Sequence, residues 1–271
     1  MGKIAALDSI GSVNYAKKGH DYDPILTAFI TGASGIPSNW SKEENTDNIL
    51  IIRGLGGGSQ KAIKSCIAAG RTFYAIDTGY FGNWKHKTWH RVTKNNLQNI
   101  GPIKERPFDR LQQIGYKFKP YTEGSKILVC PPSNKVMNMF NEGTAEEWVE
   151  KTVKEIKQHT DRPIDVRMKP LRSERVTTKT IQAALADDVH CLVTYNSISS
   201  TEALMEGKPA ITLGPNSAQL ICETNLANIE NPRIPTKDET EAYFAHLSYA
   251  QFTCMEFESG FAWKILQEGE Q

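Results

Sequence analysis

The sequence contains no apolar run that approaches the roughly 18 residues needed to span a bilayer, and its N-terminus has no basic region followed by an apolar stretch. Its five cysteines are widely spaced, and no pair has the spacing of zinc ligands. The formal net charge is only +1, so the chain as a whole does not attract polyanions. These absences predict a cytoplasmic protein with reduced thiols, no metal site and no membrane partner.

Short motifs of several enzyme classes are missing as well. The sequence has no H-E-x-x-H, no G-x-S-x-G and no Walker lysine followed by Ser or Thr. Residues 54–59 (GLGGGS) are rich in glycine, but their spacing differs from that of a dinucleotide fingerprint. We therefore expect neither NAD nor ATP as a cofactor. We interpret Gly57 and Gly58 as part of a loop that lets a donor phosphate or an acceptor approach the backbone closely.

Apolar runs typical of strands alternate with amphipathic helical patterns along most of the chain. Such alternation indicates an α/β fold, in which helices cover both faces of a parallel sheet. In the N-terminal half, strands are expected at 3–7, 49–53 and 71–76, and a helix at 60–69. In the C-terminal half, strands are expected at 126–130, 163–168, 190–195 and 210–213, and helices at 144–159, 177–186 and 200–206.

The most informative segment is 193–212, where an apolar run ends in polar residues before a short helix that Gly207 is expected to stop. The first N–H groups of a helix lack partners within the helix and favour an anion such as phosphate. Ser199 and Glu202 have the spacing of a capping box, which could occupy both side chains. Because the segment holds more hydroxyls than one cap uses, we predict a phosphate or nucleotide site here. Its residues are Asn196, Ser197, Ser199, Ser200, Thr201 and Glu202.

The other predicted strands of this half also end in polar residues. Ligands bind beyond the carboxyl ends of parallel strands, so we expect these residues to lie near the segment 193–212. A polar, partly cationic set of this kind suits a nucleotide diphosphate. Its members are Ser133, Asn134, Arg167, Lys169 and Arg172, together with residues 214–217.

Residues 196–214, NSISSTEALMEGKPAITLG, resemble the donor-binding segment of nucleotide-sugar glycosyltransferases with the GT-B architecture. The resemblance covers residues 126–267 and extends to the first domain only in general layout. It implies two Rossmann-like domains that face each other across a cleft, residues 1–122 and 123–250. It also implies that the C-terminal helix, within 251–271, packs back on the first domain. The co-substrate would be a nucleotide sugar, with a UDP-sugar as the expected donor, and no further cofactor is required.

Residues 85–119 combine nine Lys or Arg with only two acids and several aromatic residues. Cations and aromatic rings bind nucleic-acid phosphates and exposed bases, although a solvated linker is the alternative interpretation. Small GT-B members in bacteriophages glycosylate hydroxymethylated DNA bases, and this compact chain with its basic segment resembles them. The resemblance therefore implies modified DNA as the leading acceptor. Its expected contacts are Tyr80, Lys87, Arg91, Lys94 and Arg106.

Asp77 is the candidate catalytic base. It follows a predicted apolar strand and precedes a Gly-Tyr-Phe-Gly turn, where side chains often face ligands. An inverting transferase needs such a group to take the proton from the acceptor hydroxyl. Asp77 could instead be a turn residue that bonds its own backbone. His20 and Asp21, with the nearby Asp23, are alternatives for the base.

Other functions remain open alongside DNA glycosylation. A cell-surface glycan is the second acceptor class, because related segments occur in sugar transferases of capsule and lipopolysaccharide. A sugar-nucleotide epimerase and a noncatalytic module that binds a nucleotide or nucleic acid are the remaining hypotheses. We expect a monomer or a weak dimer, located in the host cytoplasm if the protein is encoded by a phage.

Overall fold

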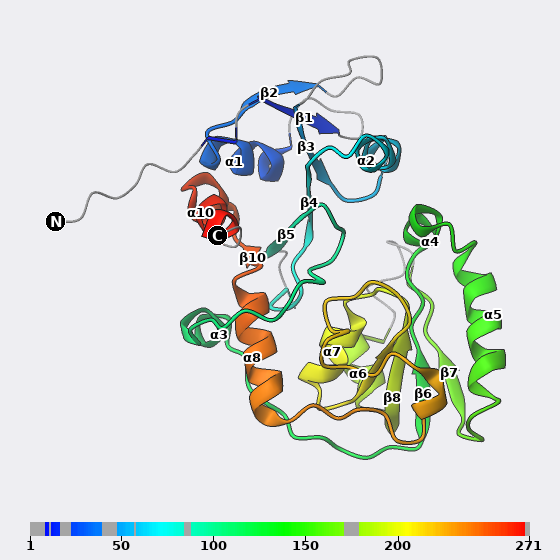
Figure 1. The fold of residues 1–271 in the computed structure, drawn as a ribbon. Helices are drawn as coiled ribbons and strands as arrows, with labels where there is room; N and C mark the ends of the chain where they lie inside the picture. The colour runs from blue at the N-terminus through cyan, green and yellow to red at the C-terminus, as the bar shows by residue number, and fades with distance from the viewer. Residues whose placement is uncertain are drawn as a thin grey trace. The chain divides into compact units, whose positions relative to one another are not determined.

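The computed structural model describes residues 9–10, 12–16, 23–39, 48–56, 58–83, 88–170 and 179–268. The chain forms two compact units (Figure 1), and each has its own sheet. The first unit comprises residues 1–97 and 248–271, and the second comprises residues 98–247. No helix in the described ranges is long and apolar enough to cross a membrane.

The first unit contains a six-stranded sheet in the order β10-β5-β4-β3-β1-β2. The four strands from β1 to β4 are parallel, whereas β5 and β10 are antiparallel to their neighbours. The predicted strand at 3–7 lies outside the described residues, and β1, β2, β5 and β10 had not been predicted. The strands are β1 (Ser12–Ala16), β2 (Ile36–Asn39), β3 (Ile49–Arg53), β4 (Phe73–Thr78), β5 (His90–Lys94) and β10 (Gln251–Phe252).

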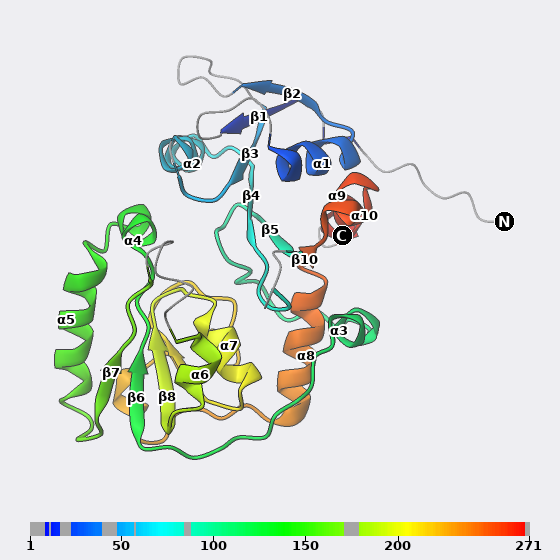
Figure 2. The same cartoon turned by 180° about the vertical axis from the view of Figure 1, so that it is seen from behind.

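Helices from both ends of the chain build the core of the first unit (Figure 2). The ring of Phe29 lies 5.5 Å from that of Phe257 and 6.3 Å from that of Trp263. A Cβ on Gly32 would lie 1.8 Å from the Phe257 carbonyl oxygen, so only glycine allows α1 and α9 to pack this closely. The C-terminal helices therefore belong to the first unit, as expected. The helices are α1 (Pro24–Gly32), α2 (Ser59–Ala68), α9 (Cys254–Glu258) and α10 (Phe261–Glu268).

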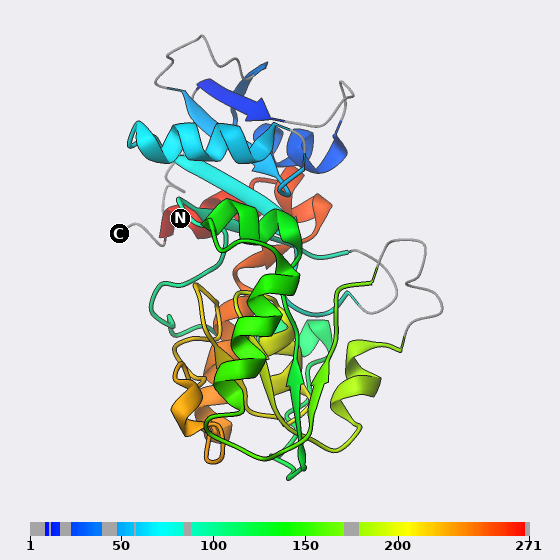
Figure 3. The same ribbon diagram turned by 90° about the vertical axis from the view of Figure 1, so that its right-hand side faces the viewer.

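The second unit contains a four-stranded, fully parallel sheet in the order β7-β6-β8-β9. Helix α5 covers one side of this sheet (Figure 3), and its apolar residues Trp148 and Ile156 belong to the core there. The predicted capping box of Thr144 and Glu147 starts that helix. Helices α6 and α7 lie on the other side of the strands. The strands are β6 (Lys126–Val129), β7 (Ile164–Val166), β8 (Val189–Thr194) and β9 (Ala210–Thr212). The helices are α3 (Asp109–Ile114), α4 (Asn134–Phe140), α5 (Ala145–Ile156), α6 (Ile181–Leu185), α7 (Ser199–Met205) and α8 (Lys237–Ser248), with a 3-10 turn at Leu226–Asn228.

The boundary between the units differs from the one expected at residue 122. Residues 98–122 belong to the second unit because they bond to it and pack on it along their length. The Gln98 side chain donates to the Asn196 carbonyl oxygen at 2.8 Å, and the Thr122 amide donates to the Gly207 carbonyl oxygen at 3.1 Å. Between them, the Tyr116 ring stacks on Phe244 with 4.5 Å between centroids. The basic aromatic segment is therefore divided between the units and does not form one surface element.

Candidate functional site

The carboxyl edge of the second sheet is the candidate binding site. All four strands run in the same direction, so the residues that follow them share one edge. Ser133 follows β6, Arg167 follows β7, and Asn196 and Ser197 follow β8. These residues were predicted to lie near one another, and the strand directions place them along the same edge. Lys169 is exposed just beyond Arg167.

Glu202 is the most perturbed acid at this edge. It lies in the first turn of α7, where its carboxylate accepts a weak hydrogen bond of 3.5 Å from the Gln182 side chain of α6. Burial raises the pKa of the Glu202 carboxyl to about 7, although the nearby Arg167 charge and the Gln182 amide favour the carboxylate. The Arg167 guanidinium also donates to the Lys179 carbonyl oxygen at 2.8 Å, which holds its side chain across this edge. An acid and an arginine that together can bind a polar ligand thus lie within one small region.

The capping box expected from Ser199 and Glu202 does not form. The N-cap of α7 is Ile198, which has helical dihedral angles and makes no side-chain cap bond. Ser199 is therefore already inside the helix, whereas a capping residue must have an extended backbone. Its hydroxyl is buried beside the Cys130 thiol, and Glu202 is left to face Arg167 and Gln182. Gly207 ends the helix as predicted, with a φ of +67°.

Most of the hydroxyls in this segment bond within the protein. Ser200 is fully buried and donates to the Asn216 side-chain oxygen at 2.9 Å. Thr201 is also fully buried, and its hydroxyl lies 2.8 Å from that of Tyr243 on α8. The surplus of hydroxyls that suggested a phosphate site is thus largely used to join α7 to its neighbours. Ser197 is only half-buried, and its hydroxyl accepts from the Ser199 amide at 3.3 Å.

The predicted residues after β6 are mainly structural. The Asn134 side chain accepts from the Ala145 amide at 2.5 Å and donates to Glu146 at 3.4 Å, so it joins the start of α4 to the start of α5. Ser133 is half-buried, and its carbonyl oxygen accepts from the amides of the following turn. Ser133 and Asn134 remain predicted contacts of the sugar donor.

The glycine turn of the first unit leaves open space around its backbone. A Cβ added to Gly54, Gly56 or Gly58 would have no other heavy atom within 4 Å. Gly58 is the N-cap of α2, and no side chain among the described residues caps the first turn of that helix. Arg53, just before the turn, forms an ion pair of 2.9 Å with Asp23, and Asp23 also caps α1. Asp23 is therefore committed to structure.

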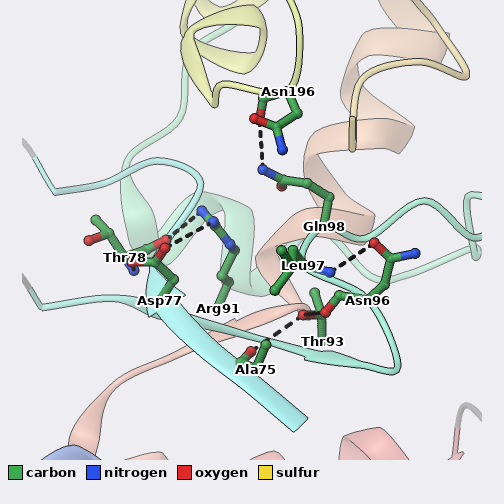
Figure 4. Close-up of polar contacts among 9 residues, drawn as sticks. All are labelled: Ala75, Asp77, Thr78, Arg91, Thr93, Asn96, Leu97, Gln98 and Asn196. Carbon is green, nitrogen blue, oxygen red and sulfur yellow. Dashed lines mark hydrogen bonds and ion pairs between the residues drawn. The ribbon is translucent and has the colours of Figure 1, made fainter. Parts of the chain in front are cut away.

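Asp77 lies near the carboxyl end of β4, as predicted, and half of its side chain is exposed (Figure 4). One carboxylate oxygen accepts from the Thr78 amide at 2.7 Å, and the other lies 3.3 Å from the Arg91 guanidinium. Arg91 reaches Asp77 because β5 runs antiparallel to β4 and places the two residues opposite each other. The exposed carboxylate remains a predicted general base, with Arg91 as the cation that orients it.

Tyr80 and Arg91 do not form the exposed DNA surface that was expected. Their exposed fractions are only 1% and 8%, and the Arg91 guanidinium lies over the Tyr80 ring at 5.4 Å. Gln251 of β10 accepts from the Tyr80 amide at 2.7 Å and so closes this turn from the C-terminal end of the chain. The burial of Arg91 was not predicted because residues 85–119 read as one basic segment in the sequence, whereas β5 is a strand within the sheet.

The remaining predicted residues have diverse positions. Lys94 is exposed at the end of β5, and Arg106 is half-buried near His246. Three residues that bond to this edge, Gln98, Gln182 and Tyr243, had not been predicted because none has a local motif, and Asn216 was predicted only within the range 214–217. His20, Asp21, Gly57, Lys87 and Arg172 lie outside the described residues.

Comparison with known proteins identifies the fold. No protein-family model and no curated sequence matches the chain. A solved structure named Thermosulfurimonas dismutans KpsC, beta Kdo 2,4 transferase, is similar over 89% of this chain and 90% of its own, with 15% identity and a TM-score of 0.50. Another, Thermosulfurimonas dismutans KpsC, beta Kdo 2,7 transferase, is similar over 95% and 99%, with 13% identity and a TM-score of 0.51. This likeness confirms the α/β, GT-B-like fold.

Proposed function

We propose that the protein is a glycosyltransferase that moves a sugar from a nucleotide sugar to a hydroxyl acceptor. The observation that carries the proposal is the buried Glu202, bonded to Gln182 and near the charge of Arg167, at the carboxyl edge of the second sheet within a GT-B-like fold. The similarity over nearly the whole length of two sugar transferases supports the same class of reaction. A nucleotide sugar is the donor that this class requires.

The donor would bind at the edge formed by β6, β7 and β8. Arg167 and Lys169 supply positive charge for the phosphate, and Ser197 is a half-buried hydroxyl at the adjacent strand end. The Glu202 carboxylate can accept hydrogen bonds from sugar hydroxyls. Because the pKa of Glu202 is raised to about 7, donor binding should strengthen as the pH rises through that value.

The transfer step needs a base and a stabilised leaving group. In an inverting transfer, the acceptor oxygen bonds to the anomeric carbon as that carbon loses its bond to the phosphate oxygen. We assign the base to the Asp77 carboxylate, which takes the acceptor proton, while the negative charge passes to the phosphate of the departing nucleotide. The ion pair with Arg91 orients the Asp77 carboxylate before the step.

We propose a saccharide hydroxyl as the acceptor in preference to a DNA base. DNA binding requires accessible cations and rings, whereas Tyr80, Arg91 and Arg110 are buried. Lys119 is also engaged, in an ion pair of 2.5 Å with Glu206. The two similar structures are named for transfer of Kdo, which favours the cell-surface glycan hypothesis over the phage DNA hypothesis.

The test is a transfer assay followed by mass spectrometry. Purified protein is incubated with uridine- and cytidine-linked sugars and either a set of saccharides or hydroxymethylated DNA. We expect a sugar mass on a saccharide, and a sugar mass on DNA alone would restore the DNA hypothesis. Isomerised donor without any acceptor would indicate an epimerase, and nucleotide binding without turnover would indicate a noncatalytic module. If no nucleotide binds and no sugar moves, the proposed function is wrong.

A further inference from the structure

The Ser197 carbonyl, in the turn between β8 and α7, is bonded by a buried amide from the loop after β9. Asn216 follows β9 and is 1% exposed. Its side-chain nitrogen donates to the Ser197 carbonyl oxygen at 3.1 Å. Its side-chain oxygen accepts from the Ser200 hydroxyl at 2.9 Å and from the Ala218 amide at 2.9 Å. The side chain therefore uses donor and acceptor groups at once, and both reach the turn.

These contacts form a closed ring. The Ser200 hydroxyl that donates to Asn216 also lies within 3.0 Å of the Ser197 carbonyl oxygen, so all three groups contact one another. The Ser197 carbonyl is thus directed toward α7 and the loop after β9. Because a trans peptide holds its C=O and N–H in opposite directions, the orientation of this carbonyl also fixes the direction of the Ile198 N–H.

We propose that Asn216 is a positioning residue for the donor: its amide sets the orientation of the Ser197–Ile198 peptide at the edge where the nucleotide sugar binds. This inference rests on the proposed function. Without the amide, the Ser197 carbonyl loses a buried donor, and the peptide can rotate away from the orientation that the donor requires. The donor then has to reorder the turn on binding, so its affinity falls while the chemical step stays intact.

A second buried bond nearby supplies a matched control. The Tyr243 hydroxyl lies 2.8 Å from that of Thr201 and 3.3 Å from that of Ser217, so it joins α7 and the same loop to α8. It does not contact the Ser197–Ile198 peptide through these bonds. Tyr243→Phe removes this hydroxyl and keeps the buried ring, so it should weaken the fold without turning the peptide.

The experiment measures donor KM, kcat at saturating donor, and Tm for the wild type, Asn216→Asp and Tyr243→Phe. Aspartate keeps the two acceptor bonds of Asn216 but presents an oxygen to the Ser197 carbonyl where the amide donated. We expect donor KM to rise about tenfold in Asn216→Asp, as for the loss of one buried hydrogen bond, with kcat close to that of the wild type. Tyr243→Phe should lower Tm and leave donor KM unchanged.

Two results would overturn the proposal. One is an Asn216→Asp variant that keeps the wild-type donor KM, and the other is an equal rise of donor KM in Tyr243→Phe, which would indicate general loosening. If Asn216→Asp does not fold, Asn216→Ser is measured in its place with the same expectations. Failure of the proposed function is separate, because it would appear as a wild-type protein that neither binds nor transfers a sugar nucleotide.

Discussion

The turn after β3 and the turn after β8 each connect a parallel strand to a helix, but they are stabilised in opposite ways. In the first, Gly54, Gly56 and Gly58 have open space where a side chain would be, and α2 begins without a side-chain cap. In the second, the carbonyl oxygens of Asn196 and Ser197 accept side-chain bonds from Gln98 and Asn216. The first turn is open at its glycines, whereas the second is held by side chains from other segments.

The difference separates two ways to prepare a backbone for a ligand. A glycine turn allows close approach, but its conformational freedom must be lost on binding. A turn held by buried side chains has already lost that freedom during folding. We infer that the turn after β8 is the more ordered of the two before any ligand binds, which suits the recognition of a constant group such as the nucleotide.

The largest expected effect comes from Asp77, on the strand beside the glycine turn. Asp77→Asn keeps the shape of the side chain but removes its capacity to take a proton, so kcat should fall by about 10² to 10⁴. Steady-state kinetics with saturating donor and acceptor measure this change. Calorimetry should find unchanged donor binding, because the residues proposed to bind the donor lie in the second unit. Near-normal turnover would transfer the role of base to His20 or Asp21.

The pH dependence of stability tests the contact between His246 on α8 and the segment around Lys104. His246 on α8 accepts from the Lys104 amide at 3.1 Å, and burial with the charges of Arg106 and Lys104 lowers its pKa from 6.5 to about 4. Because the folded state disfavours the charged ring, the neutral ring of His246 contributes fully to the free energy of unfolding above pH 6.5. This contribution is lost as the pH falls toward 4. The difference amounts to about 3 kcal/mol.

Denaturant unfolding of the wild type and His246→Gln between pH 4 and pH 7.5 measures this dependence. Glutamine does not titrate, so the free energy of unfolding of the variant should vary less across the range. Parallel curves for the two proteins would show that His246 is not the group responsible.

Ser200→Ala tests whether the hydroxyls of the second turn are structural. The substitution removes a fully buried bond to Asn216, and we expect the free energy of unfolding to fall by about 1–3 kcal/mol. The sequence predicted the Ser200 hydroxyl as part of a phosphate or nucleotide site, whereas its burial and its bond to Asn216 indicate a structural role. An unchanged Tm for Ser200→Ala would contradict the structural role.

Gly56→Ala is the matched change in the first turn and has the smallest expected effect. Its new methyl group meets open space, so stability should change by less than about 1 kcal/mol, toward greater stability because the unfolded chain loses freedom. Thermal unfolding of both variants gives the comparison directly. A loss in Gly56→Ala as large as that in Ser200→Ala would remove the distinction between the two turns.

Local patterns in the sequence were sufficient for much of the second unit. Strand–helix alternation, the Thr144 capping box and the stop at Gly207 depend on neighbours within a few residues, and the structure contains all three. The burial of Tyr80 was missed because it depends on Gln251, which is 171 positions away from Tyr80. The use of the hydroxyls was missed for the same reason, since their partners lie on a separate loop and on α8.

The most direct test of the central claim is a calorimetric titration of UDP and CMP into the wild type, Glu202→Gln and Glu206→Gln at pH 8. Glu206 is the C-cap of the same helix, one turn beyond Glu202, and pairs with Lys119, so it controls for the loss of a carboxylate. We expect at least one nucleotide to bind the wild type and Glu206→Gln equally, and to bind Glu202→Gln about tenfold more weakly, as for one lost charged hydrogen bond. Equal affinity in all three proteins would contradict a nucleotide site at the carboxyl edge of the second sheet.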